Sequence, residues 1–200
     1  MSLTERSLAE HSDAVLVTGP PELFGELFER YSRWLYDYSA RRVGRQLAED
    51  LVAETFLIAF SCRDRYDPSV ANARPWLVGI LSNLLRNHQR AEVRWLRALA
   101  RTGIDPLGAA GRGNGAFADC ASERLDALAA TRHLAGALVS LPKQQREVLL
   151  LHVWAGMDYP ELAAALGLAP GTVRSRLHRA KARLRQALPD HYANDHRERS

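Results

Sequence analysis

The stretch from Asp158 to Leu188 limits the possible folds more than any other part of the chain. Its pattern is that of two helices joined by a tight turn. Asp158 followed by Glu161 three residues later is typical of a capping box at a helix N-terminus. Gly167 can leave a helix with a positive φ, and Pro170 suits the first turn of a following helix. This stretch therefore predicts a helix-turn-helix.

The second helix of this pair has two different faces. Apolar residues recur on one stripe, at Val173, Leu177, Ala180, Leu184 and Leu188. The charged residues between Gly171 and Gln186 are all basic: Arg174, Arg176, Arg179, Lys181, Arg183 and Arg185. Arginine can bind guanine edges in a major groove or the phosphates beside it. The alternatives are a solvated amphipathic helix or a basic helix that meets an acidic partner.

Composition is consistent with a soluble protein that binds a polyanion. The chain has 200 residues, a formal net charge of +4 and an isoelectric point of about 9.4. It has no apolar run long enough to span a bilayer and no signal-peptide pattern at its start, so we expect no membrane insertion and a cytoplasmic location. Cys62 and Cys120 make no disulfide framework, and the histidines lack metal spacing. The sequence predicts no metal and no cofactor.

The N-terminal part of the chain begins with two predicted helices after a loose polar arm. The arm covers residues 1–21. From Glu22 onward, apolar and aromatic residues recur at intervals of three and four, which predicts a helix whose face is buried in a core. They are Leu23, Phe24, Leu27, Phe28, Tyr31, Leu35 and Tyr38. A second helix is predicted from near Gln46, and its outer face carries Glu49, Asp50, Ala53 and Glu54. Such an acidic stripe is most often solvated, and the alternative is a binding role.

A polar loop and a third helix follow. The loop from Arg63 to Pro75 carries side chains able to stack on or hydrogen-bond to an unstacked base. They are Arg63, Arg65, Tyr66 and Asn72. The third helix is predicted to run without interruption from Trp76 to Leu99, with a polar strip of Asn83, Arg86, Asn87, Arg90 and Arg94 opposite its apolar face. The strip indicates a nucleic-acid surface, and for the loop the alternative is an ordinary polar connection.

The fold class predicted from these patterns is all-α, with two small helical domains joined by a flexible linker. The Gly- and Ala-rich linker covers residues 98–122. The domains cover residues 22–97 and 123–188, and the C-terminal one contains the helix-turn-helix. Residues 189–200 form a polar tail.

Taken together, four segments resemble the extracytoplasmic-function sigma factors of the bacterial sigma-70 family. They are AEDLVAETFLIAF at Ala48–Phe60, RYDP at Arg65–Pro68, PWLVGILSNLLRNHQR at Pro75–Arg90, and the stretch from Leu141 to Arg185 that contains the helix-turn-helix. They cover most of both predicted domains. The helix-turn-helix alone is weak evidence, and its pairing with the other segments makes the resemblance specific.

The resemblance implies a partner for each surface. The helix with the acidic outer face would dock on the β′ clamp helices of core RNA polymerase, through Glu49, Asp50, Ala53 and Glu54. The β flap would be a second polymerase contact. The −10 element of promoter DNA would be bound by residues of the loop and the third helix. They are Arg63, Arg65, Tyr66, Asn72, Asn83, Arg86, Asn87 and Arg90. Thr172, Arg174, Ser175, Arg176, His178 and Arg179 would bind the −35 element. An anti-sigma factor would restrain the chain.

The function implied is that of an alternative sigma factor, which directs core polymerase to promoters and promotes DNA melting. A competing hypothesis is a stand-alone regulator that binds DNA through the same helix-turn-helix. It leaves the acidic face and the Asn/Arg strip unexplained. An enzyme is a third hypothesis, but the sequence shows no nucleophile–base pair, phosphate-binding loop or metal cluster, so no catalytic residue is predicted.

Overall fold

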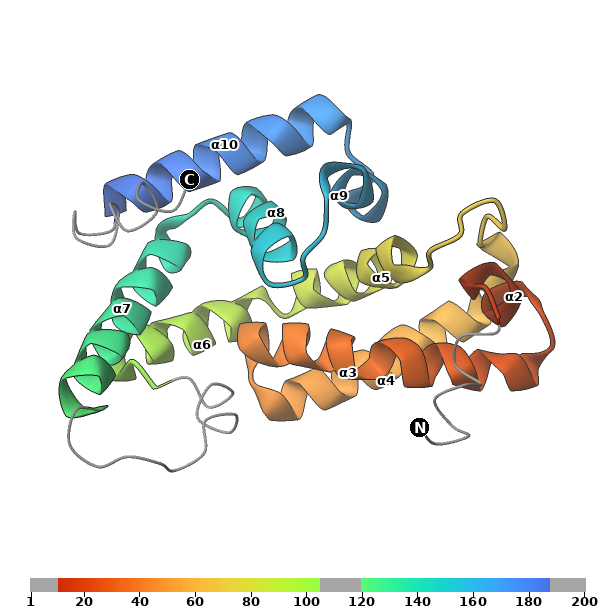
Figure 1. The fold of residues 1–200 in the computed structure, drawn as a ribbon, viewed down its shortest axis with the longest axis horizontal. Helices are drawn as coiled ribbons and strands as arrows, with labels where there is room; N and C mark the ends of the chain where they lie inside the picture. Colours follow the sequence, from red (N-terminus) through yellow and green to blue (C-terminus); the bar gives the residue numbers. More distant parts are fainter. Residues whose placement is uncertain (1–10, 105–119, 188–200) are drawn as a thin grey trace. The chain divides into compact units, whose positions relative to one another are not determined.

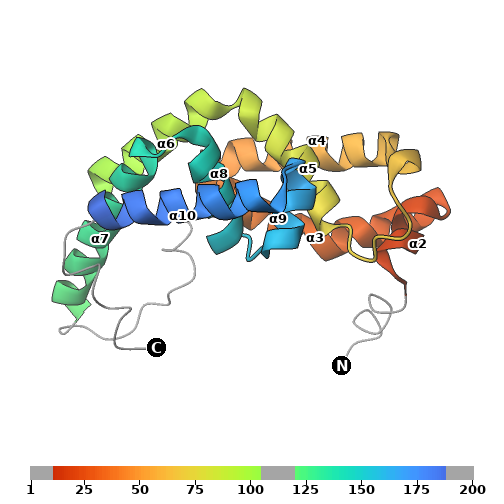
Figure 2. The ribbon, with the colours of Figure 1, turned by 90° about the horizontal axis from the view of Figure 1, so that it is seen from above.

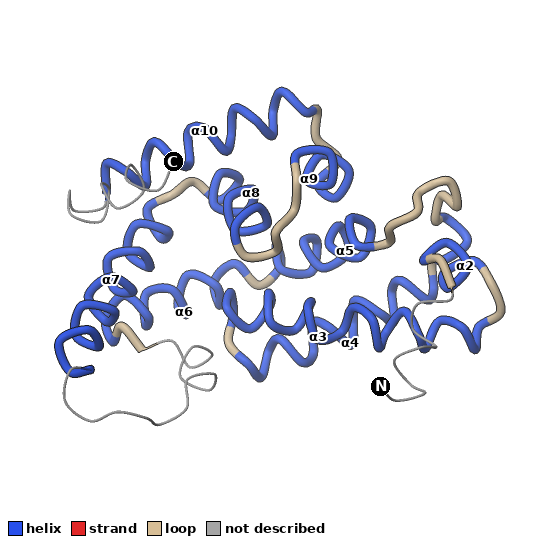
Figure 3. The backbone as a smooth tube through the Cα atoms, in the orientation of Figure 1, coloured by secondary structure: helices blue, strands red, loops and turns tan. Residues whose placement is uncertain are grey.

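The structure is a computed structural model and describes residues 11–104 and 120–187. Within these ranges the regular elements are helices, and none is a strand (Figures 1 and 3). The all-α prediction is therefore confirmed. The elements are α2 (Asp13–Thr18), η1 (Pro21–Leu23), α3 (Phe24–Val43), α4 (Arg45–Ser61), η2 (Arg63–Arg65), α5 (Arg74–Asn87), α6 (Gln89–Thr102), α7 (Cys120–Ser140), α8 (Lys143–Val153), α9 (Tyr159–Leu166) and α10 (Pro170–Ala187).

By their contacts, the described residues divide into two compact units. The first holds residues 11–88 and 157–170, and the second holds 89–104, 120–156 and 171–187. These two units group the helices differently from the predicted domains. The reason is that α6 packs against α7, and α9 packs against α5. Most of the predicted linker and the whole predicted tail, 189–200, lie outside the described residues. None of the helices within the described ranges is long and apolar enough to cross a membrane.

The first unit is built on a helical hairpin. Figures 1 and 2 show α3 and α4 side by side, and the two helices make extensive contacts. Gly44 alone joins them, with φ 90° and ψ 163°, a conformation that side chains with a Cβ rarely adopt. The core between the hairpin and α5 contains Leu27, Leu35, Leu51, Leu77 and Leu81, none more than 1% exposed.

The N-terminal segment is more ordered than the predicted loose arm. Residues 1–10 lie outside the described part, but Asp13–Thr18 forms α2, with Ser12 as N-cap. Leu16 and Val17 on this helix are fully buried. The prediction of a loose arm is therefore wrong for these residues. A helix of six residues is too short to show a periodic pattern, and only its packing reveals it.

The predicted third helix is interrupted at His88. The N–H of His88 bonds to the carbonyl of Leu85 at 3.0 Å, a tightened turn that ends α5, and α6 begins at Gln89. Each half has its own buried side chains: Leu84 and Leu85 in the first unit, and Glu92 and Leu96 in the second. The single continuous helix expected from the sequence is wrong.

The second unit combines α6, α7 and α8 with α10. Buried Val148, Leu150 and Leu151 come from α8, and Val173, Leu177 and Ala180 from α10. This confirms the apolar stripe predicted for α10 as far as Ala180. A buried ion pair lies within the same unit, where Arg146 Nη2 is 3.4 Å from Glu92 Oε2.

The predicted turn between α9 and α10 is confirmed in its local geometry. The N–H of Glu161 bonds to Asp158 Oδ1 at 2.8 Å, and the N–H of Asp158 bonds to Glu161 Oε2 at 3.0 Å, which completes the capping box. Gly167 has φ 62° and ψ 40°, the left-handed conformation expected of it, and Pro170 is the first residue of α10. The sequence alone thus placed the capping box, Gly167 and the start of α10 correctly.

Candidate nucleic-acid and polymerase interfaces

The acidic residues of α4 share its outer face. Glu49, Asp50, Ala53 and Glu54 are all exposed, whereas Ala48, Leu51, Val52, Thr55 and Phe56 are buried on the other side. The hydrophobic contacts of the inner face fix the direction in which the acidic side chains point. The outcome is an exposed, negatively charged surface on one side of α4.

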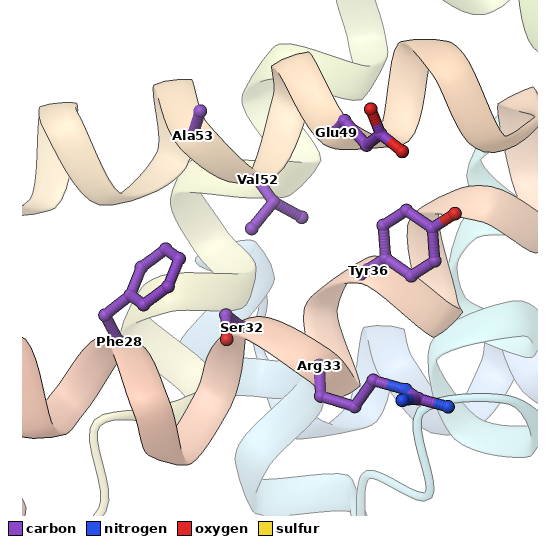
Figure 4. A pocket seen from close by; sticks show the side chains of 7 residues that line it. All are labelled: Phe28, Ser32, Arg33, Tyr36, Glu49, Val52 and Ala53. Carbon is purple, nitrogen blue, oxygen red and sulfur yellow. The ribbon is translucent and has the colours of Figure 1, made fainter.

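An apolar groove lies beside this face, between α3 and α4 (Figure 4). Its volume is about 340 Å³, and its lining residues are Phe28, Ser32, Arg33, Tyr36, Glu49, Val52 and Ala53. Phe28 was predicted to lie in the core, but it is 46% exposed, and its ring centroid lies 4.8 Å from that of Phe56. Periodicity missed the groove because a buried and a half-exposed aromatic residue follow the same spacing.

The predicted base-binding loop contains one residue that the structure places differently. Tyr66 is only 5% exposed, its hydroxyl donates to the carbonyl of Val70 at 2.5 Å, and its ring meets Trp76 edge to face at 5.1 Å. The prediction that this ring stacks on a base conflicts with its burial. Tyr66 instead anchors the loop from within, through its contact with Trp76 and its bond to the carbonyl of Val70.

The other residues of the loop differ in how freely they can move. Arg65 is exposed, while the guanidinium of Arg63 packs over the ring of Phe60 at 4.3 Å and donates to its carbonyl. Asn72 Oδ1 accepts from the N–H of Arg74 at 2.9 Å, and Asn72 Nδ2 donates to Glu161 Oε1 at 3.2 Å. Arg63 and Asn72 are therefore held in defined positions at the surface.

The polar strip predicted on the third helix is divided by the break at His88. Asn83, Arg86 and Asn87 are exposed on α5, and Arg86 donates to Asn83 Oδ1 at 2.9 Å. Arg90 is exposed on α6 and belongs to the second unit. Three residues of the strip, Asn83, Arg86 and Asn87, therefore lie together on one helix of the first unit.

The polar face of α10 carries the remaining predicted contacts. Arg174, His178 and Arg179 are exposed, and Thr172, Ser175 and Arg176 are half-buried. The hydroxyl of Ser175 donates to the carbonyl of Thr172 at 3.0 Å. Since this helix has no acidic residue between Gly171 and Gln186, its positive charge is not neutralised along its own length. Such a face suits a polyanionic ligand.

Two tyrosines of the first unit have raised pKa values. Burial, with the nearby Asp13 and Asp67 carboxylates, raises the pKa of Tyr66 to about 12. Burial and the hydrogen bond to Asp13 raise the pKa of Tyr31. In the other direction, hydrogen bonds from Ser69 lower the pKa of Asp67. Within the described residues, no group of three His, Cys, Asp or Glu side chains could hold a metal ion.

The raised pKa of Tyr66 predicts how stability depends on alkaline pH. Above pH of about 10 the tyrosine ionises in the unfolded chain but stays neutral in the fold up to about pH 12. Its contribution to stability is complete below this window and is lost as the pH rises through it. We expect Tyr66→Phe to lose less stability than the wild type between these pH values, as measured by urea unfolding. Equal losses in the two proteins would contradict this explanation.

Comparisons with known proteins identify the family of this chain. Two family models match in succession, "Sigma-70 region 2" over residues 27–101 and "Sigma-70, region 4" over residues 132–184. The RNA polymerase sigma factor CarQ of Myxococcus xanthus is 32% identical over 174 residues, which cover 85% of this chain and 91% of CarQ. This chain belongs to the sigma-70 family.

Further similarities place this sigma factor in the extracytoplasmic-function (ECF) group. The ECF sigma factor BldN of Streptomyces coelicolor is 30% identical over 191 residues, which cover 95% of this chain and 66% of BldN. The structure of CnrH in complex with the cytosolic domain of CnrY matches with a TM-score of 0.58 and 29% identity, over 90% of this chain and 94% of CnrH. The resemblance to ECF sigma factors found in the sequence is therefore confirmed. Sigma factors as a family are not catalytic enzymes.

Proposed function

We propose that this sigma factor binds core RNA polymerase and directs it to promoters by recognising a −35 and a −10 element. The observation that carries the proposal is the presence of both sigma-70 regions in one chain, the second of them containing the exposed basic face of α10. A stand-alone regulator needs only the helix-turn-helix. The acidic face of α4 and the exposed Asn and Arg residues of α5 have a use only if a polymerase and a melted strand are also bound.

The chain's own part in the reaction is placement and melting. Flipping a base out of a duplex costs a few kcal/mol, and a protein lowers this cost by holding the base. In this proposal Arg65, Asn72, Asn83, Arg86 and Asn87 contact the −10 strand, while buried Tyr66 supports the loop from within. No bond to the DNA is made or broken by these residues. Synthesis of RNA is the work of the polymerase.

The −35 contact is assigned to α10. Its exposed Arg174, His178 and Arg179 would reach base edges and phosphates in a major groove. Two separate DNA contacts reinforce one another only when their spacing is fixed, and core polymerase supplies that spacing. We therefore expect the free chain to bind promoter DNA weakly, and the holoenzyme to bind it tightly.

The acidic face of α4 is proposed to contact the β′ clamp helices. Reversing two charges with Asp50→Lys and Glu54→Lys together is expected to weaken core binding by more than about tenfold, because like charges placed opposite each other cost several kcal/mol. The affinity can be measured by anisotropy of a labelled chain titrated with core enzyme. Glu29→Lys, a reversal at an exposed position of α3, is the matched control. An equal loss in the control would show a general charge effect instead.

We also propose that an anti-sigma factor restrains this chain, with the polymerase-binding surface of the first unit as its point of contact. The support is the solved complex of CnrH with CnrY and the apolar groove of Phe28 beside the acidic face. Binding there would exclude the polymerase by direct competition. An anti-sigma factor that left core affinity unchanged would contradict this arrangement.

Run-off transcription tests the main proposal. Purified bacterial core enzyme is incubated with a genomic promoter library, with and without the chain. We expect new start sites that share upstream −35 and −10 sequences. If no start site appears and the chain alone binds a specific duplex tightly, the sigma-factor function is contradicted and a stand-alone regulator takes its place.

A further inference from the structure

The carboxylate of Asp13 lies buried at the centre of a hydrogen-bond network in the first unit. Its side chain is 5% exposed. Oδ1 accepts a hydrogen bond from Arg30 Nη1 at 2.5 Å. Oδ2 accepts one from the N–H of Ala73 at 2.8 Å and another from the hydroxyl of Tyr31. Arg30 Nη2 also donates to the carbonyl of His11 at 3.1 Å. One carboxylate thus joins α2, α3 and the segment that enters α5.

The network reaches the N-terminus of α5 through Ala73. Ala73 is the N-cap residue of α5 and has no side chain that could accept a hydrogen bond from the helix N-terminus. The carboxylate of Asp13 supplies an acceptor and a negative charge at this end of the helix from a distant part of the sequence. Negative charge is favourable at a helix N-terminus because the peptide dipoles point their positive ends there. Asp13 therefore holds the backbone at the residue that precedes α5.

Asn72 is held by the same arrangement. It precedes Ala73 directly, and its Oδ1 lies 3.3 Å from the hydroxyl of Tyr31. The single proton of that hydroxyl is shared between the carboxylate and Asn72, and the charged acceptor makes the shorter bond. A loss of the carboxylate would release both Ala73 and Tyr31, which adjoin Asn72. Asn72 would keep its hydrogen bonds to the N–H of Arg74 and to Glu161.

We propose that Asp13 is a positioning residue for −10 recognition, which holds Asn72 and the start of α5 in the geometry that the melted strand requires. This inference rests on the proposed function of the loop and of α5. Asp13 lies before residue 27, where the family match begins. The N-terminal segment would thereby be a working part of the promoter-reading unit.

The amide variant Asp13→Asn tests the proposal while preserving the shape of the side chain. A carboxylate has only acceptors, whereas an amide must turn an NH₂ group toward at least one of the donors around it. The matched control is Asp37→Asn on α3, where an exposed carboxylate pairs with Arg33 one turn away. Tyr31→Phe is a milder second variant, which removes one donor and keeps the ring. It keeps the test open if Asp13→Asn fails to fold.

The first readout is independent of any promoter. We expect Asp13→Asn to increase hydrogen exchange of the Ala73 amide by about tenfold or more, and Asp37→Asn to leave it unchanged. The second readout uses the holoenzyme and a promoter from the run-off experiment. The affinity for a single-stranded −10 oligonucleotide should fall by about tenfold, with less discrimination against substituted bases, while core affinity changes by less than about twofold.

The possible results distinguish a failure of the positioning role of Asp13 from a failure of the proposed promoter-recognition function. If Asp13→Asn folds and keeps wild-type −10 affinity and discrimination, the positioning role is overturned. If core affinity falls in parallel with −10 affinity, Asp13 is only a residue that stabilises the fold, and the proposal is again overturned. If the wild-type holoenzyme itself fails to select the −10 strand, the proposed function fails, whereas the exchange measurement still shows whether Asp13 holds Ala73.

Discussion

Replacing Glu92 by alanine is expected to lower the free energy of unfolding by roughly 3–5 kcal/mol, because it leaves a buried guanidinium without its carboxylate. The side chains of Glu92 and Arg146 are 2% and 5% exposed, and their charged groups are 3.4 Å apart. Arg146 also donates to the carbonyls of Leu138 and Leu141 near the end of α7. The pair therefore joins α6, α7 and α8. Urea unfolding followed by circular dichroism measures the loss.

Two further variants decide whether the buried charge is the cause. Glu49→Ala, at an exposed position of α4, should change the unfolding free energy by less than about 0.5 kcal/mol. The double variant Glu92→Leu with Arg146→Met removes both charges and should recover much of the stability, since apolar replacements of a buried pair are often neutral. A double variant less stable than Glu92→Ala would show that the hydrogen bonds of Arg146 matter more than its charge.

The substitution with the largest expected effect on promoter use is Arg174→Ala. Arg174 is exposed in the first turn and a half of α10, where a recognition helix meets base edges. A good bidentate contact to guanine contributes about 1–3 kcal/mol of discrimination, which corresponds to roughly 5–150-fold in affinity. We expect a loss of this size for the holoenzyme at its own −35 element, and a smaller loss at promoters with substituted −35 bases.

Salt dependence separates base recognition from phosphate contact. The matched variant is Arg185→Ala, near the C-terminus of α10, where we expect a uniform, modest loss across sequences and a shallower dependence of affinity on salt. Arg174→Ala should relax −35 preference more than it changes the salt slope. If both variants give the same uniform loss, α10 binds phosphates alone, and −35 preference arises elsewhere.

Features that depend on neighbours in the sequence were predicted correctly. The capping box of Asp158 and Glu161, the left-handed Gly167 and the start of α10 at Pro170 all follow from residues a few positions apart. The exposed acidic face of α4 follows from periodicity, which sorts one side of a helix from the other. The two sigma-70 regions were recognised from short motifs at the right separation.

Features that depend on distant partners were missed. Phe28 has the spacing of a core residue, yet the groove beside it is left open by the small side chains of Ser32 and Ala53. Tyr66 has an aromatic side chain of the kind that stacks on bases, and only its contact with Trp76 shows that it is buried. Asp13 lies in a polar stretch without periodicity. Its role becomes visible only once Arg30, Tyr31 and Ala73 surround it.

The one-residue connection at Gly44 has a consequence for how a partner meets the first unit. Gly44 donates to the carbonyl of Ala40 and accepts from the N–H of Ala48, so both flanking helices continue their hydrogen bonding through the connection. A connection of one residue, with φ at 90°, keeps the end of α3 and the start of α4 close together. The acidic face and the groove are thus preorganised before any encounter, and association loses little conformational entropy on this side. A binding partner must adapt its own shape to this fixed surface.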